Sequence, residues 1–185
     1  MSNLLVQNIK HTNGTTAQTI DSSGNTTVSQ NLTVSGSQIL TPARPFFHVY
    51  IDNSGSNPNS GGTSHLVPFD GVVSNVGSHF NATSSGNGYS FTAPVAGVYQ
   101  FNWNLSIYGI SSGQYFRQQV RKNGSAYQYL EYKDSATTDD QNINSGFAIL
   151  LSASDYIQFY AQTQSGTFNY SAGSDWNTCT GYLVG

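Results

Sequence analysis

Charge is scarce in this sequence. Charged residues make up 8% of the 185 positions, against roughly a quarter in ordinary soluble domains. Six Lys and Arg against nine Asp and Glu leave a net charge of -3. Because the six cations are scattered, they form no basic stripe able to neutralise a phosphate backbone. We therefore expect no nucleic-acid partner.

Cysteine and long apolar runs are equally scarce. Cys179 is the single cysteine, so no intrachain disulfide can form and stability has to come from packing or association. The first residues, MSNLLVQNIKHTNG, lack the basic segment and apolar run of an export signal. No stretch approaches the ~20 apolar residues of a membrane span. These absences predict assembly in a cytoplasm without membrane insertion.

Aromatic side chains, by contrast, are abundant. They make up 13% of the chain, with 12 Tyr and 10 Phe, and they favour β-structure and protein interfaces. Glycine and β-branched residues interrupt every window in which a long helix would form. The sequence predicts an all-β protein.

The first 41 residues differ from the rest of the chain. They contain no aromatic residue, and glycines recur at positions 14, 24 and 36, which predicts short strands separated by turns. Their few apolar residues cannot build a core, so this arm must either pack on a partner or be disordered. We expect it to braid with two copies of the chain or to dock on a larger particle. The residues assigned to this docking arm are Leu4, Leu5, Val6, Ile9, Ile20, Val28, Leu32 and Val34.

A proline-containing segment at 41–45 marks the predicted boundary between an arm, 1–41, and a head, 42–185. Within the head, alternation places five apolar residues from Tyr99 to Ile107 on one face of a long strand. The other predicted strands cover 46–51, 66–70, 114–122, 126–133, 145–152, 155–161 and 178–184.

Several phrases of the head occur in a fixed order. They are Leu66–Asp70, Asn75 to Asn81, Phe-Thr-Ala-Pro-Val-Ala-Gly-Val-Tyr-Gln-Phe at 91–101, Lys122-Asn123-Gly124, the pair 145–151 and 155–159, and Thr180–Leu183. This order resembles the globular heads of the complement 1q and tumour necrosis factor superfamily, with Ser154 replacing the usual glycine. The resemblance implies a jelly-roll β-sandwich that assembles as a homotrimer and binds partners without catalysis.

The phrase TAQTIDSSGNTTVSQNLTVSG at 16–36 is similar to the amino-terminal leader of small virion proteins from tailed phages, marine and cyanophage types in particular. This second resemblance implies a virion location and an arm bound to a major capsid or tail protein. A short chain without a shaft favours head decoration or a head fibre. The alternatives are a tail-fibre or tail-tip receptor-binding protein and a non-viral lectin-like module. A low-complexity Ser/Thr linker is the plain alternative for the phrase itself.

Catalytic and metal candidates are weak. Gly109-Ile110-Ser111-Ser112-Gly113 matches the nucleophile-elbow pattern but lies between two predicted strands, where that elbow does not function. The histidines, at 11, 48, 65 and 79, lack zinc-type spacing. Asp134, Asp139 and Asp140 offer oxygen ligands to calcium, although a solvated loop is the favoured interpretation. We therefore predict a non-enzyme without cofactors.

Tyrosines suggest the self-association surface. Tyr156 and Tyr160 share one face of a strand, and we assign them, with Tyr182, to a trimer interface; core tyrosines are the equal alternative. Polar loops at 53–64, 83–88, 109–114 and 134–143 suit either recognition of a host glycan or an inert surface.

Overall fold

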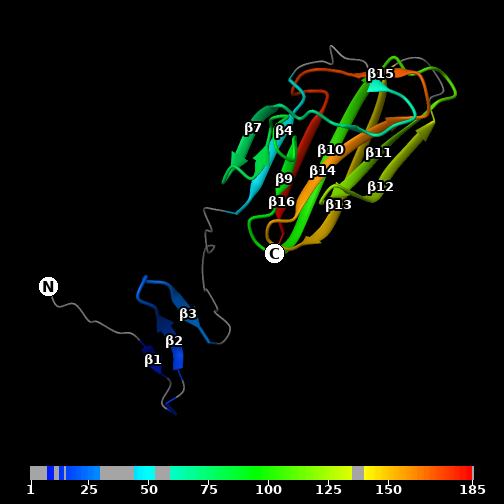
Figure 1. Cartoon of the computed structure of the whole chain (residues 1–185). Helices are drawn as coiled ribbons and strands as arrows, with labels where there is room; N and C mark the ends of the chain where they lie inside the picture. Colours follow the sequence, from blue (N-terminus) through cyan, green and yellow to red (C-terminus); the bar gives the residue numbers. More distant parts are fainter. Residues whose placement is uncertain are drawn as a thin grey trace. The chain divides into compact units, whose positions relative to one another are not determined.

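The structure is a computed structural model, and it describes residues 8–10, 13–14, 16–29, 44–52, 59–134 and 140–184. Contacts between residues divide the chain into two units, Met1–Thr41 and Pro42–Gly185, drawn in Figure 1. Every regular element in the described residues is a β-strand. The all-β prediction is therefore confirmed.

The first unit is a three-stranded antiparallel sheet, made of β1 (Asn8–Lys10), β2 (Thr16–Ile20) and β3 (Thr26–Val28). The Asp21 carboxylate organises the turn between β2 and β3. It accepts hydrogen bonds from the backbone N–H groups of Ser23 and Asn25 at 2.9 and 2.8 Å, and from the Asn25 side-chain amide at 2.9 Å. The Asn25 side-chain bond first, and then the backbone bonds, lower the pKa of Asp21. The part Thr-Ile-Asp-Ser-Ser-Gly-Asn, residues 19–25 of the phrase that resembles a phage leader, thus closes a hairpin.

The second unit, the head, is a sandwich of two antiparallel sheets, both visible in Figure 1. In the first sheet the central strand β10 pairs with β13 on one edge and with β16 and β15 on the other. Beyond β16 the sheet continues with β4 and then β7. Beyond β15 it continues with β5. The strands of this seven-stranded sheet are β4 (Phe46–Tyr50), β5 (Asn59–Ser60), β7 (Gly71–Val76), β10 (Gly97–Tyr108), β13 (Gln141–Leu151), β15 (Thr167–Tyr170) and β16 (Thr178–Leu183).

The second sheet has the order β12-β11-β14-β9-β8, and β6 also pairs with β14. The strands of this six-stranded sheet are β6 (His65–Leu66), β8 (Phe80–Asn81), β9 (Ser90–Thr92), β11 (Tyr115–Lys122), β12 (Ser125–Asp134) and β14 (Tyr156–Thr163). Two packed sheets with these crossing connections form the predicted jelly-roll sandwich.

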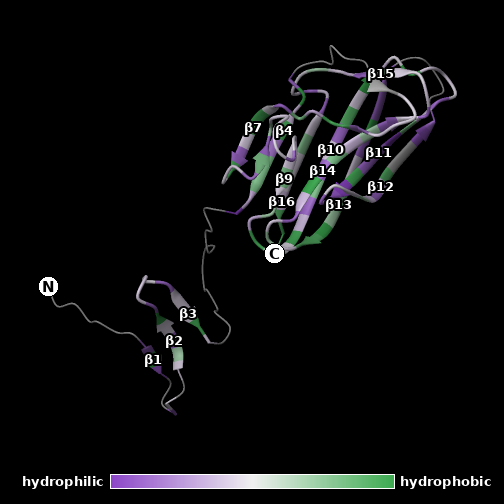
Figure 2. Cartoon of the chain, in the orientation of Figure 1, coloured by the Kyte–Doolittle hydropathy of each residue, from purple (hydrophilic) through white to green (hydrophobic). Residues whose placement is uncertain are grey.

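Alternation along the strands decides which side chains enter the core. On β10 the five residues at odd positions from Tyr99 to Ile107 are at most 3% exposed, as predicted. Hydrophobic and hydrophilic residues follow one another along the strands in Figure 2. Phe159 of β14 meets this row from the other sheet, 5.1 Å from Trp103 and 5.9 Å from Phe101 between ring centroids. Interlocked rings therefore join the two sheets.

Two predicted strands differ in extent from the observed ones. The strand expected at 66–70 ends at Leu66, although Val67 and Phe69 are buried. The strand expected at 145–152 begins at Gln141, because it pairs with β10 over eleven residues. Long-range pairing sets both limits, and local residue patterns do not report it.

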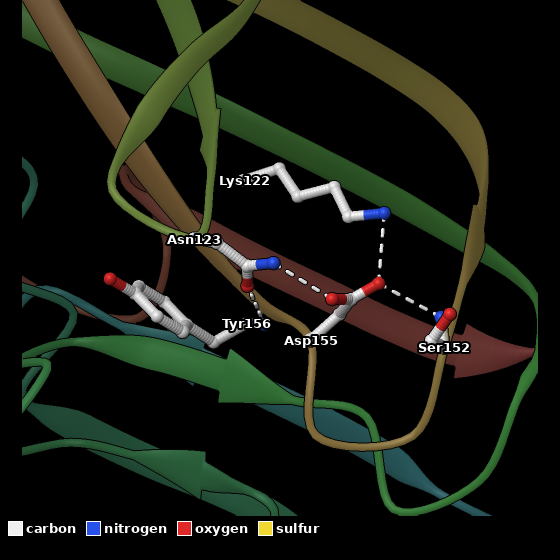
Figure 3. A network of polar contacts seen from close by, with 5 residues as sticks. All are labelled: Lys122, Asn123, Ser152, Asp155 and Tyr156. Atoms are coloured by element: carbon white, nitrogen blue, oxygen red, sulfur yellow. Dashed lines mark hydrogen bonds and ion pairs between the residues drawn. The ribbon is translucent and has the colours of Figure 1, made fainter.

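A polar network ties together two turns at one end of the six-stranded sheet (Figure 3). Asn123, at φ 51° in the turn after β11, donates from Nδ2 to Asp155 Oδ1 at 2.7 Å and accepts from the backbone N–H of Tyr156 at 2.8 Å. Asp155 Oδ2 accepts from the N–H of Ser152 at 2.9 Å and lies 2.8 Å from Lys122 Nζ. These contacts, Lys122 first, hold the pKa of Asp155 at about 2.

This network predicts a defined acid dependence of stability. The pKa of Asp155 is lower in the folded chain than its ordinary value of 3.8. The contribution of the Asp155 carboxylate to the stability of the fold is therefore complete above about pH 4 and is lost as the pH falls towards about 2. Asp155→Asn should lower the melting temperature at pH 7, and the gap to the wild type should narrow between pH 4 and pH 2. Thermal unfolding followed by circular dichroism at several pH values measures this, with Asp175→Asn in an exposed loop as the control. Parallel curves for the wild type and Asp155→Asn would contradict it.

Candidate functional site

The outer face of the seven-stranded sheet carries exposed apolar side chains at one end. Leu150 of β13 is 70% exposed and pairs with Val98 of β10, itself 37% exposed. On the other side of β10, Tyr182 of β16 pairs with Phe46 of β4. Val184 lies beside Val98, since its N–H donates to the Val98 carbonyl at 2.7 Å. We call these five residues the apolar end; contiguous exposed apolar surface of this kind marks an interaction site.

The rest of the same face is lined by amides and hydroxyls. A hollow of about 410 Å³ opens there, lined by backbone and side chains of β10, β13 and β16, among them Asn102, Asn144 and Thr180. Gly146 lines this hollow, and a Cβ at that position would lie 2.6 Å from Asn102 Oδ1. The face thus combines a polar hollow with an apolar end, the mixture typical of protein interfaces.

The structure separates the three predicted interface tyrosines. Tyr182 lies at the apolar end and is 42% exposed, whereas Tyr156 and Tyr160 belong to β14 of the six-stranded sheet. There they alternate with Ile157 and Phe159, which are fully buried, so both tyrosines face away from the core. No single sheet face holds all three, because alternation reports which way a side chain points and not which sheet its strand joins.

Sequence reasoning missed Leu150, the most exposed of the large apolar side chains described. A signal for it existed: Leu150 and Leu151 are adjacent on a strand, so one of them had to face outward. Leu151 is fully buried and Leu150 is the outward one.

The described residues of the arm leave their apolar side chains in solvent. Ile9 of β1 is 49% exposed, Val28 of β3 is 38% exposed, and Ile20 of β2 is half-buried. Five further residues of the predicted docking arm, Leu4, Leu5, Val6, Leu32 and Val34, lie outside the described residues. None of the arm residues that the structure describes is buried, so the described part of this sheet contains no core of its own.

The Gly-x-Ser-x-Gly pentapeptide forms a connection between the two sheets. It follows β10 and precedes β11, and Gly109 and Gly113 adopt φ values of 84° and 79°. No helix follows the serine in the part of the chain that the structure describes, so the geometry of a nucleophile elbow is not present there.

Metal-binding groups do not gather either. Within the described residues, no three His, Cys, Asp or Glu side chains lie close enough to hold an ion. His11 and Asp139 fall outside those residues. Cys179 is fully buried, and burial raises the pKa of its thiol well above the ordinary value, which disfavours the thiolate that ligation and nucleophilic attack require. No helix among the described residues has the length and apolar character to cross a membrane.

Comparison with solved structures first defines the class. The chain is similar to the globular domain of zebrafish complement 1qA protein, with 16% identity, a TM-score of 0.54, and 77% of this chain and 98% of that chain covered. It is also similar to murine APRIL, with 12% identity, a TM-score of 0.57, and 76% and 99% covered. These likenesses show the jelly-roll fold of the complement 1q and tumour necrosis factor type, with which a homotrimer is consistent.

The family follows from the sequence itself. The family model for the C1q domain matches residues 47–184, so the chain belongs to the C1q domain family. No curated protein matches it. Domains of this type are commonly trimeric and typically serve as non-enzymatic binding or structural modules.

Proposed function

We propose that the chain is a homotrimeric structural protein of a tailed-phage virion, displayed as a decoration or fibre on the capsid head. In this proposal the arm attaches to the major capsid protein, and the C1q head projects outward, where it aids capsid stability or adhesion to the host. The observation that carries the proposal is a C1q head joined to an arm whose described residues form no buried core. Such an arm requires a partner to bury its apolar residues.

The apolar end supports the trimer. Leu150, Val98 and Tyr182 occupy neighbouring strands of one sheet face, and two further copies would remove them from water around a threefold axis. The polar hollow on the same face would then be enclosed by amides from three chains, which suits a closed assembly better than an open one because each donor finds acceptors in the next copy.

The arm supports the virion location. Its leader phrase resembles those of tailed-phage virion proteins, and in the structure residues 20–26 of that phrase form a hairpin turn fixed by Asp21 and Asn25. A hairpin with exposed strands offers backbone edges to a neighbouring protein, which is a common mode of docking.

Immunogold labelling of purified particles tests the location. We expect an antibody raised against the full chain to decorate the head of each particle, with label lost when residues 1–41 are deleted. Label confined to the tail would support the tail-fibre or tail-tip receptor-binding alternative. Absence of label from particles, with the chain free or on cells, would contradict the virion proposal and favour a lectin-like module.

A further inference from the structure

A second surface, on the outer face of the six-stranded sheet, carries arginines held by tyrosines. Along β11, Phe116, Gln118 and Val120 turn into the core, so the intervening residues face outward. With side chains of the neighbouring strands they form what we call the arginine–tyrosine surface: Tyr115, Arg117, Gln119, Arg121, Tyr129 and Tyr160.

Arg117 is fixed by two rings and one amide. Its guanidinium carbon lies 4.3 Å from the Tyr129 ring centroid and 5.2 Å from that of Tyr115. Its Nε and Nη2 donate to Gln162 Oε1 at 3.1 and 2.7 Å. Gln162 is itself 7% exposed and donates to the carbonyl of Gly62 at 3.1 Å. These contacts with the outer face of the sheet therefore hold the guanidinium in one orientation.

Arg121 is held in the same manner. Its guanidinium carbon lies 3.9 Å from the Tyr160 ring centroid, and its Nε donates to Gln119 Oε1 at 3.3 Å. Gln119 is 2% exposed although it lies on the outer face, because the side chains around it cover it. Two arginines four residues apart on one strand are thus presented alike, roughly 13 Å from each other along β11.

Neither arginine is neutralised by an acid that the structure describes. Their acceptors are neutral amides, and no described carboxylate lies within ion-pair distance of either guanidinium, whereas the neighbouring Lys122 is paired with Asp155 at 2.8 Å. A guanidinium has five N–H donors; Arg117 uses two of them on Gln162 and Arg121 uses one on Gln119. The remaining donors and the full charge are available to an anion, on a chain whose net charge is -3.

We propose that the arginine–tyrosine surface binds an acidic polysaccharide whose sugar rings carry carboxylates. A planar guanidinium matches a carboxylate in a bidentate pair. Tyr129, 53% exposed, lies beside Arg117, and Tyr127, 50% exposed, lies two residues before Tyr129 on the same strand. Both add amphipathic rings suited to the apolar faces of sugars. Two arginines are too few to neutralise a nucleic-acid backbone, but their separation spans several sugars of a chain. Binding at this surface rests on the adhesive role proposed above and names the ligand for that role. It requires the trimer only for avidity.

Binding of the full chain to polygalacturonate, measured by isothermal titration calorimetry, tests this proposal. Arg117→Gln combined with Arg121→Gln should weaken binding by about tenfold or more, because charge-assisted hydrogen bonds to two carboxylates are lost. The control, Lys10→Gln combined with Lys133→Gln, removes the same charge from two exposed lysines and should stay within about twofold of the wild type. Replacing both arginines by lysine should also weaken binding, since the planar guanidinium is lost.

If the control Lys10→Gln with Lys133→Gln weakened binding as much as Arg117→Gln with Arg121→Gln, the proposal would be overturned in favour of bulk charge. It would also be overturned by a wild type that binds only dextran sulfate or duplex DNA, or no polymer at all. Sedimentation of the same samples gives their mass. A trimer that fails to bind polygalacturonate contradicts this surface and leaves the trimer standing, whereas a monomer that binds contradicts the trimer alone.

Discussion

Gly181→Val should unfold the head or cost it about 3 kcal/mol or more. Gly181 is buried in the middle of β16, paired with Phe47 on one side and Phe101 on the other. A Cβ at this position would lie 2.4 Å from Phe47 Cε1 and 2.6 Å from Phe101 Cδ1. Inserting carbon into a packed core commonly costs about 1–3 kcal/mol, and valine adds three carbons where even one has no room. Against a typical total of about 5–15 kcal/mol, this is a severe loss.

The two rings have little freedom to move aside. Phe47 packs against Phe80 with ring centroids 4.8 Å apart and against Phe91 at 5.3 Å, while Phe101 packs against Phe147 at 5.2 Å. Glycine within a strand often marks such a close approach. The sequence phrase Thr-Gly-Tyr-Leu, noted above only as part of a resemblance, therefore has a packing reason.

Urea unfolding of Gly181→Ala, Phe47→Leu and the double variant separates crowding from a general loss of strand propensity. If the glycine is required for space, the double variant should be more stable than the sum of the two single losses predicts, because the smaller side chain makes room for the methyl group. Strictly additive losses would contradict the explanation. Thr180→Val, a nearly isosteric change on the outer face of the same strand, should have a small effect.

The sequence predicted the core well because burial follows a local rule. Tyr99, Phe101 and Trp103 alternate with polar residues, and that period alone places them inside. The outer faces follow no such rule. Tyr160 and Tyr182 look alike in sequence, yet β14 pairs with β11 and β9 whereas β16 pairs with β10 and β4, so the two tyrosines belong to opposite sheets. Sheet membership depends on pairing between distant segments, which one strand's composition does not encode.

The same limit applies to the arginine–tyrosine surface. Arg117 and Arg121 were visible as two of six scattered cations, and scattering argued against a basic patch. They become a site because β11 aligns them and because Tyr129 of β12 and Tyr160 of β14 lie on either side in register with Gln119. A signal was present in their spacing of four residues on a predicted strand, which places them on one face.

Leu150→Arg should convert the trimer to a monomer while leaving the fold intact. Leu150 is 70% exposed in the single chain, so the substitution removes little buried area there and should change the stability of the head by less than about 0.5 kcal/mol. In a trimer that buries the apolar end, three guanidinium groups would be desolvated near one another with no partner. Desolvation and like-charge repulsion of that kind cost several kcal/mol, enough to weaken association by roughly a hundredfold or more.

Sedimentation equilibrium distinguishes three chains of 19.9 kDa each from one. The wild type should sediment as the trimer at micromolar concentration, and Leu150→Arg as the single chain with an unchanged far-ultraviolet spectrum. Thr92→Arg places the same charge at an exposed position of β9, in the other sheet, and should remain a trimer. A Leu150→Arg variant that stays trimeric would remove the apolar end from the interface, whereas loss of the trimer in both variants would indicate that net charge, and not this surface, controls association.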